Sequence, residues 1–182
     1  MFINIDFHII RKGITKAMDF DKAASFWERK ESEQIMEEAE LRGAIDAFVG
    51  RHKICALATG TGDFVRNTPI EYNYIGGKFW LFSEGGLKFK ALKENKNVCL
   101  AIYEENPDFG CLHGMQIYGK ADVIEHFSDD YNKLLEYKKI PLDAVKKMEE
   151  PINLIRVIPK EIDFLNSDFK KNGFDSRQHL SL

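Results

Sequence analysis

Arg66 and Lys88 are the residues whose types and spacing most directly suggest chemistry. The segment between them, "RNTPIEYNYIGGKFWLFSEGGLK", predicts two β-strands joined by Gly76-Gly77, a two-residue loop of the kind that type I′ turns require. Pairing across that loop brings Arg66 level with Leu87, beside Lys88. A planar guanidinium and a mobile ammonium at one end of a β-hairpin are suited to holding a phosphate. Side-chain alternation predicts one shared face for Arg66, Thr68, Ile70 and Ser83.

Two glycines before Lys88 favour the same chemistry. Gly85-Gly86 allows a close backbone approach just before a helix predicted over 87–95, whose first N–H groups favour an anion. Lys88 lies in the first turn of that helix, where the helix dipole alone disfavours a cation. An anion held between them explains both features. The alternative is that Arg66 and Lys88 are solvated and that Pro69, which cannot donate to a ladder, marks an edge strand.

The rest of the chain predicts a mainly β fold with flanking helices. Short apolar segments that follow one another closely are typical of an antiparallel sheet or barrel. The predicted strands are 53–59, 64–75, 78–83, 97–104, 114–125 and 152–159, followed by the edge-like segment "EIDFLN" at 161–166. Gly119, inside the longest of them, marks a bulge or bend of the kind that barrels need.

Helices are predicted on both sides of these strands. Two precede the first strand, at 19–31 and at 32–50, the second running from a capping Ser32 to Gly50. Two more, at 128–139 and 142–149, lead to the last strand. Because the sequence has no internal repeat and no linker, we expect a single domain over 19–182, preceded by an N-terminal extension over 1–18.

Composition excludes several classes of protein. The net charge of −3 over 182 residues includes no basic block, so no nucleic-acid partner is expected. No apolar run approaches the roughly 18 residues of a membrane span. Cys55, Cys99 and Cys111 form no close pair, which favours reduced thiols and a cytoplasmic protein. Cys111 and His113 lack the further ligands of a structural metal site, so no metal is expected.

The order and spacing of these elements resemble the pyridoxamine 5′-phosphate oxidase-like FMN-binding split-barrel family. The resemblance is carried by "RNTP", "FSEGGLKFKALKENKNVCL", "YGKADVIE" and "IRVIPKEIDF". It implies a six-stranded antiparallel split β-barrel, FMN as the cofactor, and a homodimer with flavin at the subunit interface. Helices that precede "CALAT" are closer in layout to the nitroimidazole-resistance (Nim-like) branch than to the oxidase itself.

The resemblance also implies which residues contact the cofactor. In the family's stricter members a hydroxyl residue stands where this chain has Gly86, so a backbone N–H would serve as a phosphate donor there. The implied set is Arg66 and Lys88 on the FMN phosphate, Asn67 and Thr68 along the isoalloxazine ring, Phe82 and Ser83 beside the ribityl chain and phosphate, and Gly86 at the turn.

The function implied is that of an FMN-binding oxidoreductase acting on a small molecule. The flavin performs the redox chemistry while the protein binds and tunes it, and no catalytic acid or base is assigned. Alternatives are a non-catalytic flavin- or haem-binding or storage protein of the same fold, a cofactor-free interaction domain, and a deazaflavin in place of FMN. Arg177 and His179 are similar to the R-x-H substrate pair of the oxidase. They lie several residues too far along the chain, which predicts a solvated tail.

Overall fold

The computed structural model describes residues 17–26, 34–105 and 108–182. The chain divides into two compact units, 1–33 and 34–182. In the first unit, the helix predicted at 19–31 is described as α1 (Phe20–Ala24), capped by the Asp19 carboxylate, which accepts from the Lys22 N–H at 2.9 Å. The predicted end of the first helix, near residue 31, and the predicted cap of the second helix, Ser32, lie outside the described residues.

In the second unit, helix α3 (Glu38–Arg51) starts later than predicted. Residues 34–37 are extended, which corrects the predicted start at Ser32. The reason is a contact distant in sequence: the Met36 N–H donates to Oε1 of Gln178 at 2.9 Å. An extended backbone here replaces the first helical turn, and α3 ends within one residue of the predicted Gly50. Its buried face consists of Leu41, Ile45, Phe48 and Val49.

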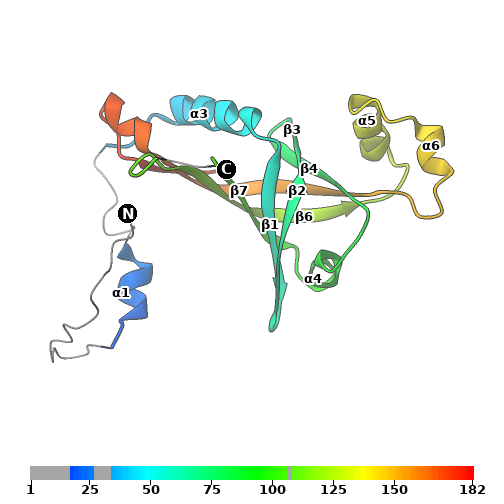
Figure 1. The fold of residues 1–182 in the computed structure, drawn as a ribbon, viewed down its shortest axis with the longest axis horizontal. Helices are drawn as coiled ribbons and strands as arrows, with labels where there is room; N and C mark the ends of the chain where they lie inside the picture. Colours follow the sequence, from blue (N-terminus) through cyan, green and yellow to red (C-terminus); the bar gives the residue numbers. More distant parts are fainter. Residues whose placement is uncertain (1–16, 27–33, 106–107) are drawn as a thin grey trace, which may run out of the picture. The chain divides into compact units, whose positions relative to one another are not determined.

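A curled antiparallel sheet forms most of the second unit (Figure 1). Its order is β2-β1-β5-β6-β7-β4-β3, with β8 added on β7. The described strands are β1 (Ile54–Thr61), β2 (Phe64–Glu71), β3 (Asn73–Ile75), β4 (Lys78–Ser83), β5 (Asn97–Tyr103), β6 (His113–Ile124), β7 (Asn153–Asn166) and β8 (Arg177–Ser181). The sheet curls until β2 contacts β4. The predicted split barrel is therefore confirmed as a curled antiparallel sheet of seven strands in order, one more than predicted because of the short β3, and β8 lies off this order.

The hairpin predicted over 64–83 is only partly correct. Of the two strands that replace the predicted strand 64–75, β3 pairs with β4, with Tyr74 opposite Phe79 as expected, whereas β2 pairs with β1. The strand breaks at Tyr72, whose N–H donates to the Lys53 carbonyl and whose hydroxyl donates to the Val49 carbonyl at 2.7 Å. The predicted pairing of Arg66 with Leu87 does not form, because β2 has left β4 by that point.

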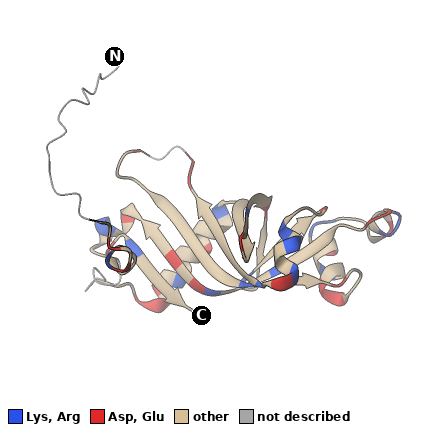
Figure 2. Ribbon diagram, turned by 90° about the horizontal axis from the view of Figure 1, so that it is seen from below, with Lys and Arg blue, Asp and Glu red and all other residues tan. Residues whose placement is uncertain are grey.

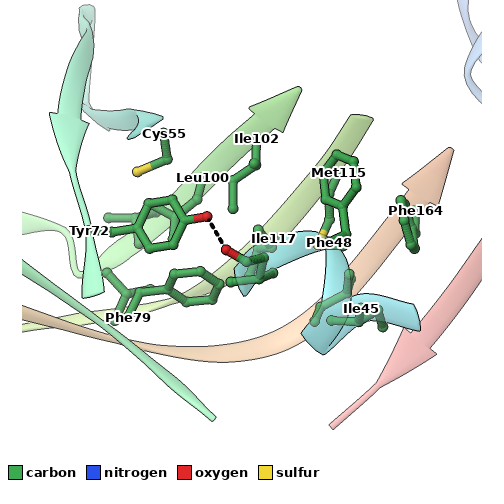
Figure 3. Close-up of a cluster of buried hydrophobic side chains, with 14 of the residues drawn as sticks. Ile45, Phe48, Cys55, Tyr72, Phe79, Leu100, Ile102, Met115, Ile117 and Phe164 are labelled. Atoms are coloured by element: carbon green, nitrogen blue, oxygen red, sulfur yellow. Dashed lines mark hydrogen bonds between the residues drawn. The ribbon is translucent and has the colours of Figure 1, made fainter. Parts of the chain in front are cut away.

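The core lies between the inner face of the sheet and α3 (Figure 3). Leu100, Ile102 and Ile117 are completely buried there, and the rings of Phe48 and Phe164 lie 4.9 Å apart. Burying each such side chain stabilises the fold by about 1.5–3 kcal/mol. The labelled set also includes Ile45, Cys55, Tyr72, Phe79 and Met115. Burial raises the pKa of the Cys55 thiol to about 12, so it packs as an uncharged group.

A bulge interrupts the pairing of β6 with β7. Tyr118 lies opposite Glu161, but Gly119 lies opposite Pro159, so the ladder skips Lys160. A Cβ at Gly119 would stand 2.4 Å from the Ile158 carbonyl oxygen, a distance that only glycine avoids. The bulge predicted at Gly119 is confirmed. The break predicted after Pro159 is wrong, because β7 continues through the bulge to Asn166.

Three further helices complete the described fold. The short helix predicted at 87–95 is α4 (Lys88–Glu94). The two predicted between β6 and β7 are α5 (Asp129–Tyr137) and α6 (Leu142–Lys146). They form a second apolar cluster with Leu154, in which the Tyr131 hydroxyl donates to the Ile152 carbonyl.

The C-terminal residues are not the solvated tail that the sequence predicted. After a 3-10 turn at Ser167–Asn172, β8 pairs with β7. The buried Gln178 side chain binds the backbone at three points, Met36 N–H, the Gln34 carbonyl and the Asp175 carbonyl. Charged residues of both signs are interspersed through the molecule (Figure 2). Among the described residues, no helix is long and apolar enough to cross a membrane.

Candidate functional site

The end of the barrel beside α4 gathers the polar residues that the sequence singled out. On β2, Arg66 lies opposite Thr59 and Thr68 lies opposite Leu57. Directly opposed residues of an antiparallel pair project to the same face. Because Thr59 and Leu57 are buried, Arg66 and Thr68 project from the inner face of the sheet. Ser83, buried at the end of β4, alternates with the inward Leu81 and so shares that face.

Lys88 is the unusual residue of this end. It is 6% exposed, at the first position of α4, and its ammonium donates to the Gly85 carbonyl. Burial lowers the pKa of Lys88, and the charge of Arg66 lowers it further. Two cations from segments far apart in sequence therefore lie close enough to repel each other. Helix α4 brings them together by packing against β1 and β2.

No carboxylate compensates these two charges. Among the ion pairs of the described residues, none within 4.0 Å includes Arg66 or Lys88. Arg66 is exposed, but Lys88 is buried, and a buried charge normally has a counter-charge, since removing it from water is costly. This end of the barrel is thus electrostatically complementary to an anion.

The turn before α4 fixes the Lys88 side chain. Gly85 and Gly86 have φ angles of +146° and +104°, in the region that L side chains rarely adopt. The Ser83 hydroxyl accepts from the Gly85 N–H at 3.2 Å and donates to the Gly85 carbonyl at 3.0 Å. The same carbonyl accepts from Lys88. Since α4 has only seven residues and no side-chain cap, we ascribe the anion preference to the side chains rather than to the helix dipole.

Two of the expected cofactor residues point elsewhere. Asn67 lies opposite Ala58 on the outer face of the sheet. Phe82 also points outward, and its ring meets Tyr131 of α5 edge-on at 6.3 Å. The structure therefore brings Arg66, Ser83, Gly86 and Lys88 to one end of the barrel. Asn67 and Phe82 could reach a ligand there only through their backbone.

Sequence reasoning missed Thr59 at this end. Thr59 is 3% exposed, and its hydroxyl has no hydrogen-bond partner among the described residues. A buried hydroxyl in this state costs about 1–3 kcal/mol. The available signal was a polar residue at an inward position of the alternating strand "ICALAT".

A cavity of about 200 Å³ lies on the outer face of the sheet, across β5, β6, β7 and β8. Its walls are mostly apolar, with polar groups from Gln116, Asp163 and Arg177. Asp163 also orients His179, whose Nδ1 lies 3.1 Å from Asp163 Oδ1 and whose Nε2 lies 3.2 Å from the Ser181 hydroxyl. The sequence missed this cavity because β8 was interpreted as a tail.

The same outer face exposes apolar side chains around small ones. Val65 is 78% exposed and Tyr103 is 62% exposed. Small residues lie between them on β1 and β5, where Ala56 is opposite Ala101. The outer face therefore leaves apolar side chains of β2 and β5 exposed.

The histidine, cysteine and carboxylate side chains of the described residues form no metal-binding cluster. His113 Nδ1 lies within hydrogen-bond distance of a Glu104 carboxylate oxygen, and His113 Nε2 lies 3.5 Å from Asp168 Oδ2. No group of three or more His, Cys, Asp or Glu side chains among the described residues is arranged to hold a metal ion.

Comparison with known proteins agrees with the fold. The family model described as pyridoxamine 5′-phosphate oxidase matches residues 41–166. No curated protein matches the chain.

Three solved structures are similar in fold. A putative pyridoxamine 5′-phosphate oxidase of Listeria innocua is 22% identical, with a TM-score of 0.55 over 69% of this chain and 98% of that one. An FAD-binding protein of Mesorhizobium loti is 13% identical, with a TM-score of 0.55 over 66% and 89%. HutZ, the heme storage protein of Vibrio cholerae, is 15% identical, with a TM-score of 0.53 over 65% and 89%. At these identities the likeness shows the fold alone.

Proposed function

The chain belongs to the pyridoxamine 5′-phosphate oxidase family, and we propose that it is an FMN-binding oxidoreductase that acts on a small molecule. The observation that carries this proposal is the buried Lys88 beside Arg66, two cations without a carboxylate partner. A phosphomonoester fits that arrangement because its oxygens accept several charge-assisted hydrogen bonds at once.

The residues present fit such a group. The Arg66 fork and the Lys88 ammonium would hold the phosphate, while the Gly86 N–H and the Ser83 hydroxyl border it. A bound flavin would supply two-electron redox chemistry. The chain itself would bind and orient the cofactor, and no residue is assigned as an acid or base.

A homodimer with flavin at the subunit interface is part of this proposal. The exposed Val65 and Tyr103, with the small residues between them, support a second copy of the chain as the occupant of the outer sheet face. Strand β2 contributes to both regions, since Arg66 projects inward and Val65 outward. Free thiols at Cys55, Cys99 and Cys111 support a reducing, cytoplasmic location.

The cavity on the outer face is the proposed substrate site. Arg177 and Asp163 supply opposite charges at its wall, and the remaining lining suits a small, partly apolar molecule. Because β8 is a paired strand, Arg177 and His179 project together from this face, as a substrate-binding pair requires.

Purification with FMN tests the cofactor proposal. The wild type should retain a flavin absorption band and release FMN on denaturation, and Arg66→Ala combined with Lys88→Ala should purify colourless. Lys93→Ala, an exposed lysine on the same helix, is the matched control and should remain yellow. A colourless wild type after reconstitution would contradict the proposal.

A storage protein of the same fold is the second candidate, since a similar structure is that of a heme storage protein. Anaerobic mixing with NADH or NADPH, followed by nitroimidazoles, quinones or oxygen, separates the two. Flavin that no donor reduces would favour storage over catalysis.

A further inference from the structure

The Thr59 hydroxyl is a buried polar group of the α4 end to which the proposed function gives no role. Thr59 is directed inward from β1, in line with the apolar Cys55 and Leu57. Its backbone lies between two ladders, opposite Arg66 on one side and Val98 on the other. Valine would fill the same volume at this position without burying an unsatisfied hydroxyl, so the hydroxyl itself needs an explanation.

The position of Thr59 places it among the anion-binding residues. Arg66 is its direct partner across the β1–β2 ladder. Helix α4 packs on β1 beside Thr59 through its C-terminal cap, since the Asn95 amide donates to the Gly60 carbonyl at 2.8 Å, and Lys88 lies at the other end of the same short helix. The Thr59 hydroxyl and the Arg66 guanidinium therefore extend from the same face of the sheet, beneath the helix that supplies Lys88.

The chemistry of the three groups is complementary to one ligand. Arg66 and Lys88 are both cationic donors, so neither can neutralise the other. An anion attracted by the two cations could also accept a hydrogen bond from a nearby hydroxyl. The chain has a glycine at position 86 and thus no side-chain hydroxyl on the helix side of this site. The hydroxyl of Ser83 is already engaged with the backbone of Gly85.

We propose that the Thr59 hydroxyl donates a hydrogen bond to the phosphate held by Arg66 and Lys88, and thereby helps the protein to distinguish FMN from riboflavin. This inference rests on the proposed flavin site. It assigns Thr59 a role in specificity for the phosphorylated form rather than in the redox step.

The isosteric variant Thr59→Val tests the proposal in the full chain. FMN should bind about tenfold more weakly or worse, because a hydrogen bond to a charged group is lost. Riboflavin affinity should not change, since riboflavin has no phosphate. The thermal midpoint of the ligand-free protein should stay level or rise, because an unsatisfied buried hydroxyl has been removed. Titration by flavin fluorescence and thermal unfolding measure these three quantities.

Thr59→Ser is the matched control. It keeps the hydroxyl and loses a methyl group, so FMN discrimination should persist while the thermal midpoint falls. The opposite responses of the two variants separate ligand contact from packing.

Each other outcome overturns the inference in a recognisable way. FMN binding to Thr59→Val at wild-type strength means that the hydroxyl is not a phosphate ligand. Equal weakening of FMN and riboflavin means that the effect comes from barrel packing, and a lower midpoint for ligand-free Thr59→Val means an internal partner such as Arg66. A wild type that binds neither flavin overturns the proposed function together with this inference.

Discussion

Helices α3 and α4 lie at different parts of the barrel (Figure 1), and the residues beside them differ in how their polar groups are satisfied. At the α3 end, Phe48 and Ile45 are almost completely buried, and the one polar atom of Tyr72 is satisfied by the Val49 carbonyl. At the α4 end, Lys88 is buried without a counter-charge and Thr59 without a hydrogen bond. The first end satisfies its polar group within the chain, whereas the second, among the described residues, leaves a buried charge and a buried hydroxyl without such partners, as the proposed anion site would require.

This contrast teaches where stability and binding can be changed independently. A substitution at the α3 end should lower the free energy of unfolding and leave ligand affinity alone. A substitution at the α4 end should do the reverse. Among the described residues, Phe48 and Lys88 share no ring or hydrogen-bond partner, so the effects of substitutions at the two ends should add.

The largest expected effect is that of Phe48→Ala. Phe48 is 1% exposed and packs against Phe164, so its loss should lower the free energy of unfolding by about 3–5 kcal/mol. Urea unfolding measures this change. Phe48→Leu leaves a smaller cavity and keeps enough stability for a flavin titration, in which FMN should bind as it does to the wild type. A loss of affinity in that variant would show that the two ends are coupled.

Lys88→Met should have the converse effect. FMN affinity should fall by about 10- to 100-fold, since charge-assisted hydrogen bonds contribute about 1.5–3 kcal/mol. Stability without ligand should not fall, because the Gly85 carbonyl keeps the Ser83 hydroxyl as a donor. Isothermal titration and urea unfolding give the two values. Lys93→Met, on the exposed side of the same helix, is the control. Equal loss of stability and affinity would contradict the division between the ends.

The smallest expected effect is a pH dependence of the difference in stability between the wild type and Lys88→Met. The pKa of Lys88 is lowered from 10.5 in the folded state, chiefly by burial and then by Arg66. Between the two pKa values the unfolded chain binds more protons, so this lysine's contribution to the free energy of unfolding rises with pH. The stability advantage of Lys88→Met over the wild type should therefore shrink as pH approaches 10.5.

Taking the difference in free energy of unfolding between Lys88→Met and the wild type cancels the contributions of other groups that titrate at alkaline pH. Burial raises the pKa of Tyr72 and that of Tyr74, and these groups lower stability as pH rises, equally in both proteins. Bound FMN should abolish the trend, because a phosphate favours the charged lysine. A constant difference across the alkaline range in urea unfolding would argue that Lys88 is not destabilised by its surroundings.

Local patterns were sufficient for the features that depend on neighbouring residues. The turn at Gly76-Gly77, the bulge at Gly119 and the shared face of Arg66, Thr68, Ile70 and Ser83 all follow from alternation and from glycine chemistry. The meeting of Arg66 and Lys88 was expected through a single long hairpin. The structure produces it by another route, through β1 and α4, because each residue's face was correct although its strand partner was not.

What the sequence could not show depends on contacts between distant segments. The alternating pattern runs unbroken from Ile70 through Tyr72, so nothing local reveals that Tyr72 binds the Lys53 and Val49 carbonyls. Strand β8 is short and polar, and Gln178 explains its position only once Met36 is seen to donate to it. That the Thr59 hydroxyl has no hydrogen-bond partner likewise could be known only once the surrounding residues had been placed.

The residue skipped by the ladder at Lys160 resets which side chains of β7 meet the interior. Val157 faces inward upstream of it and Ile162 faces inward downstream, so odd positions give way to even ones within one continuous strand. Deleting that single residue would leave Pro159, Ile162 and Phe164 at alternating positions, so these side chains would stay inward and Asp163 would stay outward. A shortened chain should consequently keep its buried residues and the rim of its outer cavity, and lose the local bend that an extra residue gives a strand.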